Sequence, residues 1–218
     1  MTPAEEVLQT LGDLVRAGKI RYFGFSDMPA WFTTKAATLA QAHGVPGPIA
    51  MQLEYSLVER TLEREYRPLA REFGLSLMPW SPLAGGFLAG KYARENPQAD
   101  GAGRLAGSNP FGNTKFTDQN WAILEVLRTV AQEQNRPLAQ VALAWVAAQP
   151  GVSAPVIGAR RPAQLHDNLA ALEIRFTPAQ LEQLTQASAP APTFPYPIFE
   201  PAINRQAVFG GASVRGWQ

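Results

Sequence analysis

The chain has 218 residues, of which 46% are hydrophobic and 17% charged, so its composition is that of a globular protein and not of a disordered one. Its 19 lysines and arginines nearly balance 18 aspartates and glutamates, which argues against nucleic acid or an anionic membrane as a general partner. The absence of cysteine excludes disulfides and thiolate zinc sites, and we expect no metal site. No apolar run is long enough to span a membrane and no signal peptide is recognisable, so we expect a cytoplasmic protein.

Strand-like and helix-like patterns alternate along the chain. Thr2-Pro3-Ala4-Glu5 is typical of a capping box with proline at the first helical position, and the apolar spacing after it predicts a helix that ends at Gly18. Apolar runs bounded by turn residues predict four strands, at residues 19–25, 49–55, 75–80 and 152–157. Helical spacing predicts one helix that opens at Thr117-Asp118 and others at residues 29–43, 61–73, 138–148, 163–172 and 179–187. The proline-rich residues 190–218 predict an extended tail that wraps over a surface.

The stretch from Leu75 to Tyr92 carries the most information about function. It reads as a short apolar strand that breaks at two prolines and opens into a glycine-rich loop with one lysine. Ligands of α/β folds bind at the carboxyl ends of parallel strands, and glycine lets backbone N–H groups approach a phosphate. At the end of this strand, Trp80 offers a flat face to a ring. From the residue types alone, a Pro/Gly turn beside a core tryptophan is the alternative.

The repeated strand–helix order predicts an α/β fold with parallel strands and right-handed crossovers. The spacing of the units suits a (β/α)8 TIM barrel, which has eight units, and four are predicted here. A partial barrel of this kind has open edges and an exposed inner face. We therefore expect a homodimer, in which two copies close one barrel around a two-fold axis, or a complementing chain. The connection over residues 81–116 is long enough to be functional.

Several segments together resemble the C-terminal half of the aldo-keto reductase family. They occur in the family's order and spacing over residues 1–189, and they are Gly24-Phe25-Ser26-Asp27, Met51-Gln52-Leu53-Glu54-Tyr55-Ser56-Leu57, Trp80-Ser81-Pro82-Leu83-Ala84-Gly85-Gly86, Gly90-Lys91-Tyr92 and Gly158-Ala159-Arg160-Arg161-Pro162-Ala163-Gln164-Leu165-His166-Asp167-Asn168-Leu169. The resemblance implies a half-barrel with NADP-binding loops over residues 1–189. It also implies NADPH-dependent reduction of small aldehydes and ketones as the ancestral activity.

The same resemblance assigns cofactor contacts residue by residue. Ser26 and Gln52 match the positions that bind the nicotinamide carboxamide, and Asp27 replaces the asparagine most common beside them. Trp80 matches the aromatic residue that stacks on the nicotinamide ring. The remaining matches are Ser81, Leu83, Gly85 and Lys91 for the loop over the pyrophosphate, Gly158 and Arg160 for the 2′-phosphate, and Gln164, Asp167 and Asn168 for the adenine end.

Simpler interpretations of these residues remain open. Arg160 and Arg161, which precede a predicted helix, suit an anion site by charge and dipole but equally a solvated pair. In a strand, Gln52 alternates with apolar neighbours and is equally consistent with a satisfied core amide. Asp167 and Asn168 are equally consistent with the polar face of a helix.

No residue here matches the tyrosine, lysine, aspartate and histidine with which the resembled family transfers a hydride and a proton to a carbonyl. We therefore expect cofactor binding without a placed proton donor, and an activity that is impaired or absent in this chain alone. A replacement acid would come from Tyr22, Tyr55, His166 or Asp27. The alternatives are a non-catalytic dinucleotide-binding or assembly protein and, more distantly, a hydrolase, against which the lack of a Gly-x-Ser-x-Gly elbow argues.

Overall fold

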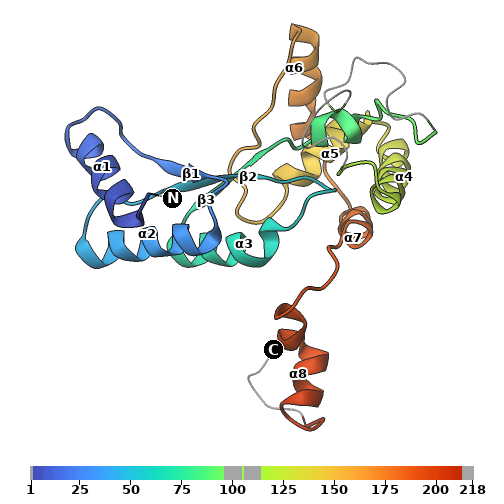
Figure 1. Ribbon diagram of the computed structural model, residues 1–218. Coiled ribbons are helices and arrows are strands. Elements are labelled where there is room, and N and C mark those ends of the chain that lie inside the picture. Colours follow the sequence, from blue (N-terminus) through green and yellow to red (C-terminus); the bar gives the residue numbers. More distant parts are fainter. Residues whose placement is uncertain (1, 96–104, 106–113, 213–218) are drawn as a thin grey trace. The chain divides into compact units, whose positions relative to one another are not determined.

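The computed structural model describes residues 2–95, 105 and 114–212 (Figure 1). The chain separates into two compact units, residues 1–188 and 189–218. The sheet of the first unit has three parallel strands in the order β1-β2-β3, and they are Gly24–Ser26, Ala50–Glu54 and Ser76–Trp80. This small parallel sheet confirms the predicted α/β class.

The two faces of the sheet differ in burial. One face is buried and is formed by Phe25, Met51, Leu53, Leu77 and Pro79. The alternate residues of the three strands form the other face, and they keep part of their surface exposed. Parallel sheets are normally covered on both faces, so this second face has the character of a surface that another layer covers.

Helices precede, separate and follow the three strands. In the first unit they are α1 Ala4–Arg16, α2 Ala30–His43, α3 Leu62–Phe73, α4 Asp118–Glu133, α5 Leu138–Ala147, α6 Pro162–Leu169 and α7 Pro178–Ala187, with 3-10 turns η1 Ala84–Ala89 and η2 Ala170–Glu173. The helices α2 and α3 contact each other, and α3 also packs on β2 and β3. No helix in the described ranges combines the length and the apolar character that a membrane crossing requires.

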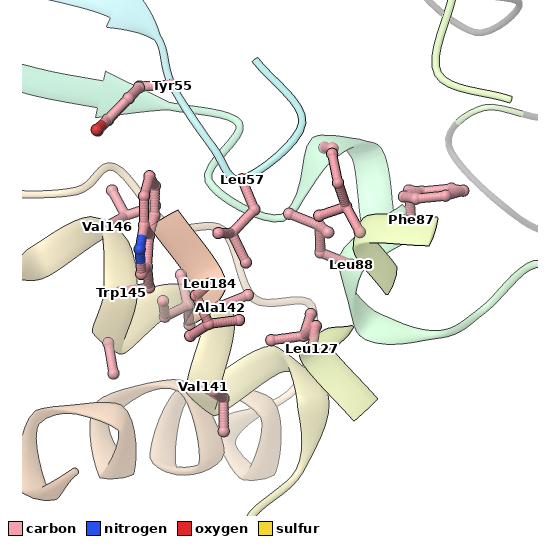
Figure 2. Packing of buried hydrophobic residues seen from close by; sticks show 14 of the residues in the cluster. Tyr55, Leu57, Phe87, Leu88, Leu127, Val141, Ala142, Trp145, Val146 and Leu184 are labelled. Atoms are coloured by element: carbon pink, nitrogen blue, oxygen red, sulfur yellow. The ribbon is translucent and has the colours of Figure 1, made fainter. Parts of the chain in front are cut away.

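The main hydrophobic core lies between β2, β3 and the helices α3, α4, α5 and α7. Figure 2 shows Trp145 of α5 beside Tyr55, and Leu184 of α7 beside the same helix. The side chains of Trp145, Tyr55, Phe87, Leu127 and Leu184 have almost no exposed surface. A separate small cluster joins α1, β1 and α2. The core therefore fixes the carboxyl half of the sheet to the helices that come after it in the chain.

Two of the predicted strands differ from the structure. The strand expected at residues 19–25 is only Gly24–Ser26, and residues 152–157 form no strand. Val152 makes a single parallel bridge to Leu77, and the N–H of Val156 donates to the oxygen of Pro79 at 2.7 Å. A regular ladder does not form because Pro79 and Pro155 both lack an N–H to donate. The prediction of a fourth strand was therefore wrong, although the segment does run beside β3.

The chain ends also differ from their predictions. Pro3 is the N-cap of α1 and no side chain caps this helix, so the capping box expected at Thr2 was wrong. A capping box is present instead at α7, between Thr177 and Gln180. In the second unit, Tyr196–Phe199 is a 3-10 turn (η3) and Pro201–Ala207 is a helix (α8), so this part of the tail is not extended. Proline suits the first turn of a helix, which explains how a proline-rich segment forms α8.

Candidate functional site

The carboxyl ends of the three strands meet at one edge of the sheet, because the strands are parallel and in register. Ser26 lies opposite Gln52 on the neighbouring strand, and Glu54 lies opposite Trp80. All four belong to the partly exposed face, with Ser26 exposed and Gln52 and Trp80 half-buried. The structure thus brings together Ser26, Gln52 and Trp80, which the sequence assigns to one end of a cofactor.

Asp27 follows β1 directly and makes hydrogen bonds to residues of all three strands at this edge. Its backbone is left-handed, with a φ of 52°, and its N–H donates to the oxygen of Gln52 at 3.1 Å. Its Oδ1 accepts a hydrogen bond of 3.0 Å from Nε1 of Trp80, and its Oδ2 accepts one of 3.4 Å from Oγ of Ser26. Asp27 therefore positions the indole of a residue that comes 53 positions later in the chain.

The glycine-rich loop after β3 is built from left-handed residues and hydrogen bonds. Oγ of Ser81 accepts a bond of 3.2 Å from the N–H of Gly85, and the oxygen of Ser81 accepts one from Ala84. Gly85 has a φ of 66°, and a Cβ there would lie 2.6 Å from the Leu105 side chain. The OH of Tyr92 donates to the oxygen of Gly85 and accepts from the N–H of Leu105. A side chain at position 85 would therefore strain the backbone and force the Leu105 side chain to move.

Lys91 lies beside this loop. A Cβ added to Gly86 would be 3.2 Å from Cδ of Lys91, so the lysine stem runs along the glycine. The Lys91 side chain is exposed, and its ammonium group makes no ion pair with a described residue. Leu83, predicted in the same loop, is half-buried and packs against the main core. Lys91 is therefore available to an anion, whereas Leu83 anchors the loop.

The predicted phosphate and adenine residues form a second group, at the start of α6. Arg160 is exposed, and its backbone N–H donates to Oε1 of Gln164 at 3.0 Å. Gly158 has open space at its Cβ position, while Asp167 is exposed and Asn168 half-buried on α6. The segment that leads to this group runs beside Trp80, because the N–H of Val156 donates to the oxygen of Pro79 at 2.7 Å. Gln164 thus orders the loop before α6, and Arg160 keeps its guanidinium available.

Lys115 is a residue near the site that the sequence did not single out. It is buried, and its Nζ lies 2.8 Å from Oε1 of Glu54 and 3.7 Å from Oε2 of Glu59. Nδ2 of Asn120 donates to its backbone oxygen at 2.9 Å. The ion pair fastens the end of the connection over residues 81–116 to the carboxyl end of β2. Glu54, the charged residue of its strand, was the signal for it in the sequence.

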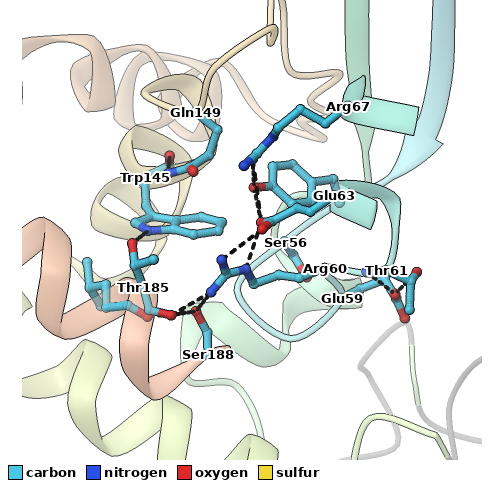
Figure 3. A network of polar contacts seen from close by, with 12 residues as sticks. Ser56, Glu59, Arg60, Thr61, Glu63, Arg67, Trp145, Gln149, Thr185 and Ser188 are labelled. Atoms are coloured by element: carbon cyan, nitrogen blue, oxygen red, sulfur yellow. Dashed lines mark hydrogen bonds and ion pairs between the residues drawn. The ribbon is translucent and has the colours of Figure 1, made fainter. Parts of the chain in front are cut away.

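A second polar network, around Arg60, was also missed (Figure 3). Arg60 binds Glu63 through two bonds, from Nε at 2.7 Å and from Nη2 at 2.9 Å. Its Nη1 donates to the oxygen of Thr185 at 2.6 Å and to Oγ of Ser188 at 2.9 Å. The guanidinium carbon lies 5.3 Å from the ring centre of Trp145. This one side chain therefore joins the loop after β2 to the C-terminal end of α7.

The same network explains the environment of Tyr55, one of the candidate acids. Its OH donates to Oε1 of Glu63 at 2.6 Å and accepts from Nη2 of Arg67 at 2.9 Å. Burial, and after it the bond to Glu63, raises the pKa of Tyr55 far above its ordinary value. The other candidate tyrosine, Tyr22, is exposed and precedes β1, so it lies at the opposite edge of the sheet from Trp80. Neither tyrosine is therefore placed as a proton donor at the candidate site.

Comparison with known proteins identifies the relatives of the chain. The model of the aldo/keto reductase family matches residues 1–189. "Uncharacterized oxidoreductase YrpG" of Bacillus subtilis is 38% identical over 173 residues, which are 79% of this chain and 50% of that protein. "Probable aryl-alcohol dehydrogenase AAD4" of Saccharomyces cerevisiae is 34% identical over 95% of this chain and 63% of its own length. "Probable voltage-gated potassium channel subunit beta" of Oryza sativa is 36% identical, over 79% and 53%.

The chain thus spans roughly half to two thirds of the length of these curated relatives. The matched region contains every strand of the sheet and both groups of candidate residues. Two of the three relatives carry the names of oxidoreductases. Since the family model covers most of the chain, the chain belongs to the aldo/keto reductase family.

Proposed function

We propose that this chain binds NADP(H) and provides the cofactor part of an oxidoreductase that reduces small aldehydes or ketones. The observation that carries the proposal is the cluster of Ser26, Asp27, Gln52 and Trp80 at the carboxyl edge of the sheet. In this proposal residues 1–189 form a half-barrel with the binding loops, and residues 190–218 form a tail. The lack of cysteine and the family's character favour the cytoplasm as its location.

The polar groups at the site fit the parts of such a cofactor. The Gln52 side-chain amide has no hydrogen-bond partner among the described residues. Its NH2 donor and its oxygen acceptor therefore remain for the carboxamide of a nicotinamide ring. Lys91 and Arg160 likewise make no ion pair within the described residues, although each is close to a loop that glycine keeps open. Unpaired cations beside such loops suit phosphate groups, and the arginine fork suits a phosphate monoester such as the 2′-phosphate.

In this proposal different residues of the chain bind and orient different parts of the dinucleotide. Bound NADPH supplies the hydride for the carbonyl carbon. Asp27 fixes Trp80 for contact with the ring, Ser26 and Gln52 orient the carboxamide, and Ser81, Leu83 and Gly85 shape the loop over the pyrophosphate with Lys91 beside it. Gly158 and Arg160 would hold the 2′-phosphate, and Gln164, Asp167 and Asn168 the adenine end.

Neither candidate tyrosine supplies a proton donor at this site. Tyr55 is buried in the Arg60 network, and Tyr22 lies at the other edge of the sheet. A carbonyl oxygen that receives a hydride without a placed acid lacks its proton and its electrostatic stabilisation. We therefore propose that the 218 residues on their own bind the dinucleotide but reduce carbonyls slowly or not at all.

Replacement of Arg160 tests the assigned cofactor. Arg160→Ala should weaken NADPH binding by about tenfold, because a charged hydrogen bond to the 2′-phosphate is lost, and should leave NADH binding nearly unchanged. Arg161→Ala removes the same charge from the next residue and is the matched control, with a smaller effect expected on either dinucleotide. Equal weakening of NADPH and NADH by Arg160→Ala would refute the assigned role.

A non-catalytic assembly protein is the second candidate. The partly exposed face of the sheet favours it, as do the exposed side chains of Leu165, Leu169 and Leu172, which are 43%, 48% and 64% accessible. A relative named as a potassium channel subunit agrees with an assembly role. We propose that a second copy of the chain, or a complementing chain, covers these surfaces and completes the barrel.

A further inference from the structure

Asp27 places an uncompensated negative charge beside Trp80. Its side chain is exposed, and within the described part of the chain it makes no ion pair. Its hydrogen-bond donors, the Trp80 indole and the Ser26 hydroxyl, are neutral groups. The other carboxylate at this edge, Glu54, differs from Asp27 because it forms an ion pair with the buried Lys115. The carboxyl edge of the sheet therefore keeps one carboxylate charge at Asp27.

This charge acts differently on the two oxidation states of a nicotinamide dinucleotide. The nicotinamide ring carries a positive charge in NADP⁺ and none in NADPH, while the phosphates are the same in both. Lys91 and Arg160, which face phosphates in the proposed function, therefore act on both forms alike. A carboxylate next to the ring attracts only the oxidised form.

We infer that Asp27 makes this site bind NADP⁺ more tightly than NADPH. The inference rests on the proposed function, which places the nicotinamide ring against the indole that Asp27 holds. Attraction between two unit charges a few ångströms apart near a protein surface predicts a preference of about tenfold. Reduction of bound NADP⁺ takes up one hydride, that is two electrons and one proton. A tenfold preference for the oxidised form therefore lowers the potential of the bound couple by about 30 mV.

The test compares the dissociation constants of NADP⁺ and NADPH by calorimetry, for the unmodified chain and for Asp27→Asn. Asparagine keeps an oxygen that accepts from Trp80 and tolerates the left-handed backbone, so this substitution removes the charge and little else. Asp13→Asn, at an exposed carboxylate on α1, is the matched control for net charge. Taking the ratio of the two constants cancels every effect on the phosphates.

We expect Asp27→Asn to shift the ratio toward NADPH by about tenfold, and Asp13→Asn to leave it unchanged. In the unmodified chain, raising the salt concentration to about 0.5 M should bring the dissociation constants of NADP⁺ and NADPH closer together, because salt screens an exposed charge. If both dinucleotides bind and the ratio is the same with and without the Asp27 charge, the inference is wrong and the proposed function stands. If neither dinucleotide binds, the proposed function fails and the inference fails with it.

Discussion

The Arg60 side chain contacts three separate segments of the chain, and its partner Glu63 balances its charge in a site that is almost closed to water. The accessible fractions of the two side chains are 7% and 14%. Burial acts to raise the pKa of Glu63, but hydrogen bonds from Arg60 and Tyr55 and the charges of Arg60 and Arg67 outweigh it and hold this pKa below its ordinary value. The ionised carboxylate therefore contributes to the stability of the folded state.

Glu63→Gln should lower the free energy of unfolding at pH 7 by about 3 kcal/mol, because it leaves the Arg60 charge buried without a counter-charge. Since the folded-state pKa of Glu63 is lowered, its contribution is fully present above the ordinary glutamate pKa and is lost as the pH falls through the folded value. Urea unfolding at a series of pH values should therefore show that the difference in the free energy of unfolding between the two proteins becomes smaller in acid. A difference that stays constant down to low pH would contradict this account. Glu125→Gln, in an exposed pair with Arg128, should change little.

That candidate residues lie close together was predictable from sequence only where strand register sets their position. Ser26 and Trp80 end their strands, Gln52 lies two residues before the end of the strand between them, and parallel strands bring these positions to one edge. The Asp27–Trp80 bond joins residues 53 positions apart, and Lys115 reaches Glu54 from a long connection. Contacts of this kind depend on side-chain directions in three dimensions, which neither periodicity nor spacing contains.

The connection after β3 is held at both ends by aromatic packing. The ring of Phe87 lies 4.8 Å from that of Trp121, and Phe116 stacks on Trp121 with an interplanar angle of 13°. Tyr92 packs against Phe116 and also joins Gly85 to Leu105. The glycine-rich loop is therefore a fixed element and can present the same backbone surface to each ligand.

Gly85→Ala should disturb this element, because it combines a φ of 66° with a Cβ only 2.6 Å from Leu105. Gly44→Ala is the matched control, since its φ is 60° and nothing lies within 4 Å of its Cβ. Both substitutions should cost about 1 kcal/mol of stability for the left-handed backbone, and Gly85→Ala should cost more because of its contact with Leu105. Only Gly85→Ala should also weaken NADPH binding, by several-fold. Equal dinucleotide affinities in the two variants would show that the loop does not contact the cofactor.

At the scale of elements, hydrophobic periodicity predicted α2, α3, α5 and the strands β2 and β3 with good boundaries. It failed at residues 152–157, where an apolar run looked like a strand but Pro79 and Pro155 remove two ladder donors. It also failed in the second unit, where proline suggested extended chain and Pro201 instead begins a helix. In both places the structure follows from proline, which lacks an N–H for a strand ladder and suits the first turn of a helix.

The whole molecule presents a parallel sheet with one partly exposed face. That face agrees with the expected partial barrel, but the barrel and its completion by a partner remain proposals. We predict by light scattering a mass well above the 23.7 kDa of one chain. Leu169→Glu, which puts a charge in an exposed apolar row on α6, should lower that mass toward one chain. A monodisperse, cooperatively unfolding protein of one-chain mass would rule out the proposed dimer.

The central claim is that the edge around Trp80 binds NADP(H), and a titration of the unmodified chain with NADPH tests it most directly. Tryptophan fluorescence is the readout, with NADH titrated alongside. We predict saturable quenching by NADPH at lower concentrations than by NADH. The absence of any saturable change with either dinucleotide would contradict the claim.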